Sequence, residues 1–145
     1  MKICTDIEQS NKLFEIGISI ETADMCWEID RTCFGIKAHN LVPFIRYNNK
    51  EKRELFQRDT ELIPAWSLAA LLEVLPQSIN KYNEIERCHK TYHLNLFRSY
   101  YFCCSYSFIP SVNDDEEINL FCVGRDNWVD TCYWMIVKLK ENNLI

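Results

Sequence analysis

The sequence predicts one α+β domain over residues 1–145, in which an antiparallel sheet packs against about four helices that form a single layer on one face. Apolar residues recur with a helical period near both ends of the chain, and with a period of two in much of the second half. The chain has 145 residues, 48% of them hydrophobic and 26% charged, so it can bury a core of its own. Only three Gly and four Pro are present, which argues against a flexible linker.

The first third of the chain predicts two helices and a β-hairpin. Thr5 and Glu8 have the spacing of a capping box, and Gly17 suits the end of the helix that this box begins. Ser19 can cap a second helix through "IETADMCWEI". "RTCFGIKA" and "LVPFIRY" are rich in strand formers, and His39-Asn40 between them predicts a tight connection. Pro43 is expected on an edge, since it cannot donate to a ladder.

The stretch "LIPAWSLAALLEVLP" (62–76) predicts a buried helix, after polar residues 48–61 that predict a loop or a short turn of helix. Pro64 suits a first helical turn, and Pro76 ends the helix. Ser67 is expected to satisfy a first-turn amide, because no base lies nearby to activate it. One stripe at helical spacing consists of Leu68, Leu71, Leu72 and Leu75. The stretch is shorter than the ~18 apolar residues of a membrane span, so no membrane partner is expected.

The second half of the chain predicts a three-stranded antiparallel meander and a closing helix. "TYHLNLF" and "YYFCCSYSF" alternate in polarity, and "INLFCVG" is apolar almost throughout, which predicts a central strand. The acidic run 114–117 is expected to be a solvated turn rather than a cluster of carboxylates that holds a metal. Asp126 or Asn127 is expected to cap the last helix. Its apolar stripe consists of Trp128, Cys132, Met135, Ile136 and Leu139.

Charge and cysteine usage restrict the setting and the partners. The net charge is −5, and no clustered basic footprint is present, so a nucleic-acid partner is not expected; an accessory factor that binds nucleic acid is kept only as a third alternative. The start "MKICTDIEQSNKLF" lacks the apolar region of a signal peptide. The eight cysteines are therefore expected to be free thiols in a reducing cytoplasm, several of them buried like small apolar residues.

The segment "CHKTYH" suggests two kinds of reactive site. Cys88, His89 and His93 resemble a metal cluster, but on a strand the two histidines lie ~13 Å apart, so no metal is expected. Alternatively Cys88 or Cys103 could act as a nucleophile with His89 or His93 as its base, as in a small hydrolase. The chain has no GxGxxG, Walker A or His-Glu-x-x-His motif, and no cofactor is expected.

Three segments of the chain resemble a known family. They are "ETADM", "PAWSLAALLEVLP" and "VDTCYWMIVKLKENNLI", and they are spread over most of the chain. The family comprises small uncharacterised proteins of Bacteroides-type gut bacteria, their prophages and other mobile elements. Its members tend to have Pro-Val-Asp-Ala near the last helix, where this chain has the departure Trp128, Val129, Asp130 and Thr131. The resemblance implies a bacterial, cytoplasmic, phage-derived setting and no catalytic residue.

These observations predict a non-enzymatic module that binds another protein, or a second copy of itself, through a sheet edge or an aromatic surface. Arg125 follows a strand and precedes a helix, a corner that often lines a cleft. Trp66 is expected to close the core or to stack on a ligand, and Tyr101 and Trp128 are further candidates for binding. The residues expected to form an aromatic patch on the sheet are Tyr92, Tyr100, Tyr101, Tyr106 and Phe121.

Overall fold

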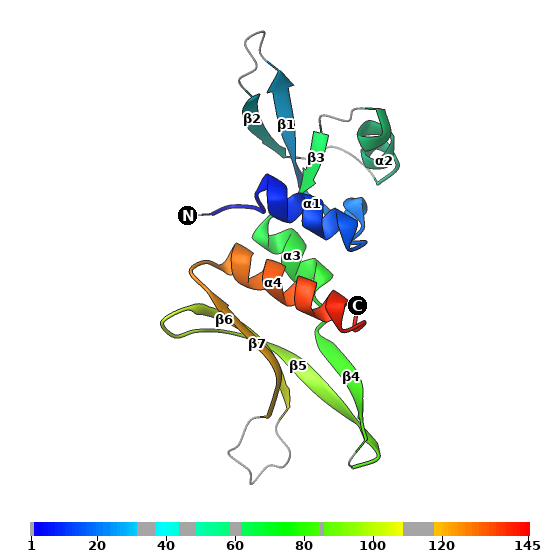
Figure 1. The fold of residues 1–145 in the computed structure, drawn as a ribbon, viewed down its shortest axis with the longest axis vertical. Helices are drawn as coiled ribbons and strands as arrows, with labels where there is room; N and C mark the ends of the chain where they lie inside the picture. The colour runs from blue at the N-terminus through cyan, green and yellow to red at the C-terminus, as the bar shows by residue number, and fades with distance from the viewer. Residues whose placement is uncertain (1, 32–36, 44–48, 59–61, 85, 109–117) are drawn as a thin grey trace. The chain divides into compact units, whose positions relative to one another are not determined.

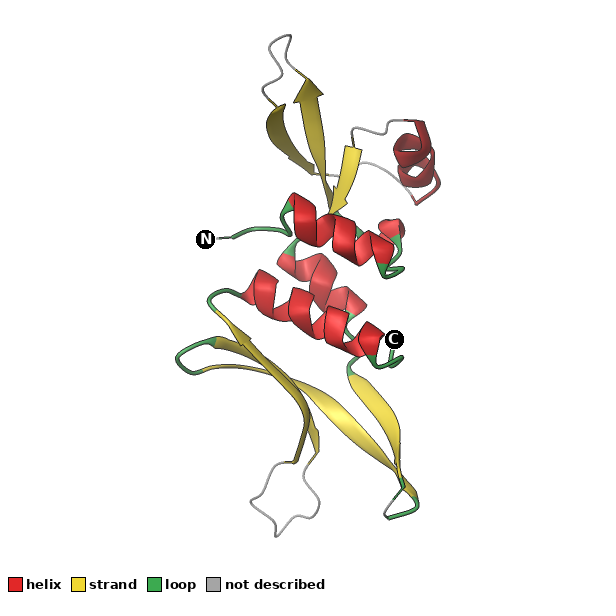
Figure 2. Ribbon diagram, viewed as in Figure 1, coloured by secondary structure: helices red, strands yellow, loops and turns green. Residues whose placement is uncertain are grey.

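The protein is described by a computed structural model that covers residues 2–31, 37–43, 49–58, 62–84, 86–108 and 118–145 (Figure 1). The chain divides into two compact units, Met1–Val74 and Leu75–Ile145, where the sequence predicts one domain. Each unit contains its own antiparallel sheet together with helix (Figure 2), which confirms the α+β class. The hairpin and the meander therefore belong to separate sheets, with strand orders β2-β1-β3 and β4-β5-β6-β7, and not to the single sheet predicted.

The elements of the first unit are α1 (Ile7–Glu15), the 3₁₀ helix η1 (Ile20–Thr22), β1 (Met25–Arg31), β2 (Lys37–Pro43), α2 (Asn49–Arg58), β3 (Leu62–Ala65) and α3 (Leu68–Val74). The elements of the second unit are β4 (Ser78–Asn83), β5 (Cys88–Arg98), β6 (Phe102–Phe108), β7 (Ile118–Arg125) and α4 (Trp128–Glu141).

Helix α1 begins one residue later than the capping box at Thr5 and Glu8 predicts. Asp6 is the N-cap, and its Oδ1 accepts a hydrogen bond from Gln9 N at 2.9 Å. Thr5 is fully buried instead, and its Oγ1 accepts from Trp66 N at 3.0 Å and lies 2.8 Å from Ser10 Oγ. Asp6 takes the capping role because this tertiary contact occupies the threonine hydroxyl. Gly17 has a φ of +82°, as predicted for the end of this helix.

The predicted second helix is wrong beyond its first turn. Ser19 caps the three residues of η1, and the chain then continues as β1, the central strand of its sheet. Pairing on both edges of β1 outweighs a weak helical period in "MCWEI". The hairpin of β1 and β2 is confirmed, but its turn falls outside the described residues, and His39 and Asn40 lie within β2. Pro43 ends an edge strand, as predicted.

The helix predicted for residues 62–76 forms only in its second half. Residues 62–65 are the strand β3, which pairs with β1 at the edge of the sheet, where Pro64 is tolerated. Ser67 caps α3, as predicted: its Oγ accepts from Ala70 N at 3.3 Å and donates to the Asp24 carboxylate, which also accepts from Ser67 N at 2.8 Å. Helix α2 occupies part of the polar stretch before β3. Lys52 Nζ anchors this helix by donating to Ala23 O at 2.6 Å and Glu21 O at 3.2 Å.

The second unit contains the predicted meander and one strand more. Strand β4 was not predicted, because its sequence is polar: only Ile79 among its residues is buried. Strand β7 lies at the edge of the sheet, so the predicted central position is wrong. Its apolar residues have a different cause, since α4 packs over β6 and β7 (Figure 1). Asn127 caps α4, as predicted, and Thr131 Oγ1 donates to Phe102 O at 2.8 Å, which joins α4 to β6.

Candidate functional site

The strand geometry keeps the predicted nucleophile and base apart. Cys88 and His89 are neighbours on β5, so their side chains leave opposite faces of the sheet. Cys103 is opposite Phe97, whereas His93 is opposite Ser107. His93 therefore shares a face with Cys103 but lies four residues along the strand, ~13 Å away. Neither pair lies within the hydrogen-bonding distance that thiol activation requires.

Three buried thiols have pKa values that keep them protonated at neutral pH. Burial, with a smaller contribution from the nearby Asp24 carboxylate, raises the pKa of Cys4 to about 11. Burial raises the pKa of both Cys104 and Cys132 to about 12. A protonated thiol in an apolar environment is a poor nucleophile and a poor metal ligand. Within the described ranges, no three His, Cys, Asp or Glu side chains lie close enough together to hold a metal ion.

Two of the predicted binding residues belong to packed structure. Trp66 is fully buried, and its Nε1 donates to Thr22 Oγ1 at 2.9 Å, so it closes the core and offers no surface to a ligand. Trp128 is half-buried, and its ring centroid lies 5.0 Å from that of Phe102. The predicted aromatic patch does not form as one surface either. Two of its members, Tyr92 and Tyr106, are buried.

The other two predicted binding residues are exposed near one end of β7. Tyr101 is 55% exposed, and Arg125 is the last residue of the strand. A Cβ on Gly124 would lie 3.4 Å from both Tyr101 Cβ and Cys103 Sγ, so the turn between β5 and β6 lies close to this residue of β7. The structure thus places Tyr101 and Arg125 beside the same segment of the edge strand.

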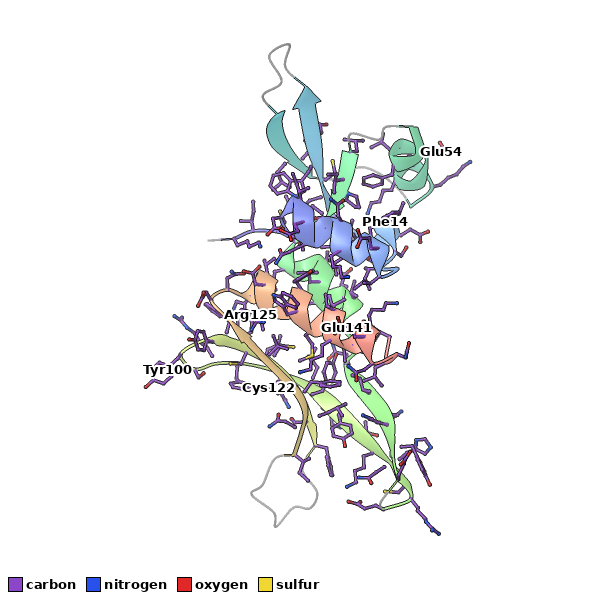
Figure 3. All side chains as sticks on the ribbon, in the orientation of Figure 1. Phe14, Glu54, Tyr100, Cys122, Arg125 and Glu141 are labelled. Atoms are coloured by element: carbon purple, nitrogen blue, oxygen red, sulfur yellow. The ribbon has the colours of Figure 1, made fainter. Side chains whose placement is uncertain are left out.

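A groove of about 350 Å³ runs along this segment, between β7 and α4. Its walls are Cys122, Val123, Gly124 and Arg125 on the strand, and Trp134, Val137, Lys138 and Glu141 on the helix. Figure 3 labels Cys122 and Arg125 on β7 and Glu141 near the end of α4. Consecutive residues of a strand point to opposite faces, so a groove that touches four in a row must follow the edge of the strand. Strand β6 covers the inner edge, and the groove therefore lies on the outer edge.

Two cations border this edge groove. The Arg125 guanidinium lies 5.4 Å from the centroid of the Trp134 ring and donates to Gly124 O at 2.7 Å. Lys138 Nζ lies 5.1 Å from the centroid of the Phe121 ring. Over the described part of the chain, neither cation forms an ion pair with a carboxylate. Glu141 is the acidic residue in the lining, so the described walls carry a net charge of +1, from two cations and one carboxylate.

Most of the residues in the helix wall of the groove were not predicted from the sequence as binding residues. Trp134, Lys138 and Glu141 have the helical spacing i, i+4, i+7, and none of them belongs to the predicted apolar stripe of α4. A large aromatic residue outside the apolar stripe, next to a lysine one turn later, was a signal for this second face. Cys122 was interpreted as a buried thiol but is exposed, because β7 is an edge strand.

A second groove, of about 290 Å³, lies in the first unit. It is mostly apolar, and its lining residues are Asn11, Phe14, Ile20, Phe56, Leu62, Ile63 and Pro64. Phe14 is 59% exposed there (Figure 3). The lining residues within the described ranges carry no charge that would indicate the chemistry of an occupant.

No family model matches the chain, and neither does any curated protein or solved structure. The resemblance to the family of Bacteroides-type bacteria therefore stays a prediction. None of the helices in the described ranges combines the length and the apolar character that crossing a bilayer requires.

Proposed function

We propose that this chain is a non-enzymatic protein-interaction module whose partner binds in the edge groove between β7 and α4. The observation that carries the proposal is the outer edge of β7, which lines a groove together with an exposed tryptophan and two cations without carboxylate partners in the described part of the chain. An open strand edge offers backbone donors and acceptors, and exposed aromatic and arginine side chains are the residue types that contribute most to protein interfaces.

We propose that this module functions in the cytoplasm of a bacterium and that its gene is of phage or mobile-element origin. The resemblance supports this setting, and so do the seven described cysteines, which are all thiols.

Site-specific cross-linking tests the proposal, because two of the described cysteines are exposed, Cys122 in the groove and Cys88 away from it. One variant keeps Cys122 and carries Cys88→Ser, while its matched control keeps Cys88 and carries Cys122→Ser. Both also carry Cys33→Ser, which removes a thiol outside the described residues. Each is labelled with a benzophenone maleimide and irradiated in a lysate of a Bacteroides-type bacterium.

The proposal predicts a discrete cross-linked product from Cys122 that Cys88 does not give and that Trp134→Ala removes. Equal labelling from both positions, or no product from Cys122 together with a strict monomer in light scattering, would overturn it.

A further inference from the structure

The outer edge of β7 has the geometry to accept one more strand. Strand β7 pairs with β6 on one side, and no described strand pairs with it on the other. Alternate backbone N–H and C=O groups of such an edge point away from the sheet and can pair with an extended chain. The groove extends over the four residues 122–125, a length of ~10 Å at ~3.3 Å per residue. An extended segment of about four residues therefore matches the length of the groove.

The helix wall would contact the side chains of such a strand. Trp134, Val137, Lys138 and Glu141 follow one another at i, i+3, i+4 and i+7, so they form one continuous face of α4 along the groove. Side chains on one side of an added strand would contact Trp134, which is 43% exposed; Val137 is buried. An extended chain held between a strand edge and a helix is a recurring mode of peptide recognition, in which backbone bonds supply affinity and alternate side chains supply specificity.

The charges of the groove favour an acidic occupant. Arg125 and Lys138 are held over the aromatic rings of Trp134 and Phe121. One N–H of Arg125 donates to Gly124 O, and the other N–H groups of the two cations remain able to donate to an anion. A second copy of the chain is disfavoured, because a two-fold interface would place each groove against the same groove and bring four cations together with only two carboxylates.

From the edge, the helix wall and the charges, we propose that the edge groove binds an extended acidic segment of another protein, which adds as a fifth strand along β7. A carboxylate of that segment would be bound by Arg125 and Lys138. This inference rests on the proposed function and adds to it the conformation and the charge of the partner.

Fluorescence anisotropy with synthetic peptides tests both parts of the inference. The probe is a fluorescein-labelled peptide of alternating threonine and valine with two central glutamates. Its matched versions replace both glutamates with glutamine or with lysine. A fourth version keeps the glutamates and has N-methyl groups on consecutive central backbone amides, which blocks strand pairing on both edges of the peptide.

We expect the glutamate peptide to bind about three- to tenfold more tightly than the glutamine peptide at low salt, with the lysine peptide weakest. High salt should reduce that difference. Arg125→Gln and Lys138→Gln should each weaken binding of the glutamate peptide and leave the glutamine peptide unchanged. Lys140→Gln, a charge change on α4 outside the groove, is the control and should change neither.

Three results would overturn the inference. Equal affinity for the glutamate, glutamine and lysine peptides would contradict the proposal that the partner segment is acidic. Undiminished binding of the N-methylated peptide would contradict the proposal that the segment adds as a strand along β7. Absence of binding by every peptide, or a Cys122 cross-link between two copies of the chain, would also overturn it. A Cys122 cross-link to another protein in the lysate would then leave the proposed function standing.

Discussion

Replacing Thr5 by valine tests the buried hydroxyl that joins the N-terminal segment to the segment after β3. Valine has nearly the same shape as threonine, so the change removes the Oγ1 atom and leaves little cavity. Thr5 N also donates to Trp66 O at 2.9 Å, and this backbone bond remains in the variant. The change therefore isolates the hydrogen bonds of Thr5 Oγ1 with Trp66 N and Ser10 Oγ.

The loss of stability follows from the two polar groups that lose their hydrogen-bond partner when the hydroxyl is removed. Both Thr5 and Ser10 are fully buried, and the Trp66 N–H would lose its acceptor. One unsatisfied buried polar group costs about 1–3 kcal/mol, so the two groups together should lower the free energy of unfolding by about 2–6 kcal/mol. Ser10→Ala removes one partner and should cost about 1 kcal/mol. The double variant should cost less than the sum, because the Ser10 hydroxyl is then no longer orphaned.

Urea unfolding followed by circular dichroism measures the loss, and hydrogen exchange of peptides from residues 2–16 and 62–71 locates it. The matched control is Thr91→Val. Thr91 is exposed, and water can replace its hydrogen bond to Asn80, so the change should stay within about 0.5 kcal/mol. A Thr5→Val chain as stable as the control, or strict additivity with Ser10→Ala, would refute the reasoning.

Three further predictions concern α2, α4 and the buried thiols. Lys52→Met keeps the stem of the side chain but loses both bonds to carbonyl oxygens, so exchange in 49–58 should rise and stability should fall by about 1–3 kcal/mol; unchanged exchange would contradict the anchoring role. Asn127→Ala removes the acceptor of Asp130 N and should cost about 1 kcal/mol in urea unfolding, whereas Asn127→Ser, which keeps an acceptor without placing a second carboxylate against Asp130, should restore most of it. Cys104 and Cys132 release their protons near the ordinary pKa of 9.0 when unfolded but only at about 12 when folded, so the unfolded state binds fewer protons above pH 9. Stability should therefore be flat below that pH and fall above it, by up to about 1.4 kcal/mol per pH unit for each thiol, and a Cys132→Ala chain with an unchanged slope would count against this assignment.

Local signals in the sequence were sufficient for the elements whose determinants lie within a few residues. Asn127 and the apolar stripe after it predict α4, and a cap and a helical stripe act within one helix. The period of two predicts β5 and β6, because side chains alternate between the two faces wherever the strand lies in its sheet; in β6 both faces are covered. Gly17 was predicted at the end of α1 because a positive φ is a local requirement.

Long-range pairing decided the elements that local signals assigned wrongly. Residues 25–31 are a strand because β2 and β3 pair with them on both sides, and residues 62–65 are a strand because β1 is available to pair. Local propensity for these segments is weak, and hydrogen bonding to distant strands outweighs it.

The order of residues in the chain by itself indicated an α+β protein able to bury its own core, with capped helices and alternating strands. Only the tertiary structure determined that β7 is an edge strand and that its last four residues face Trp134 and Lys138 across a groove. An edge strand partly covered by a helix and a central strand can have the same apolar pattern, although only Val123 among the residues of β7 is buried. They differ in which backbone groups have partners, and that depends on the order of the strands in the sheet.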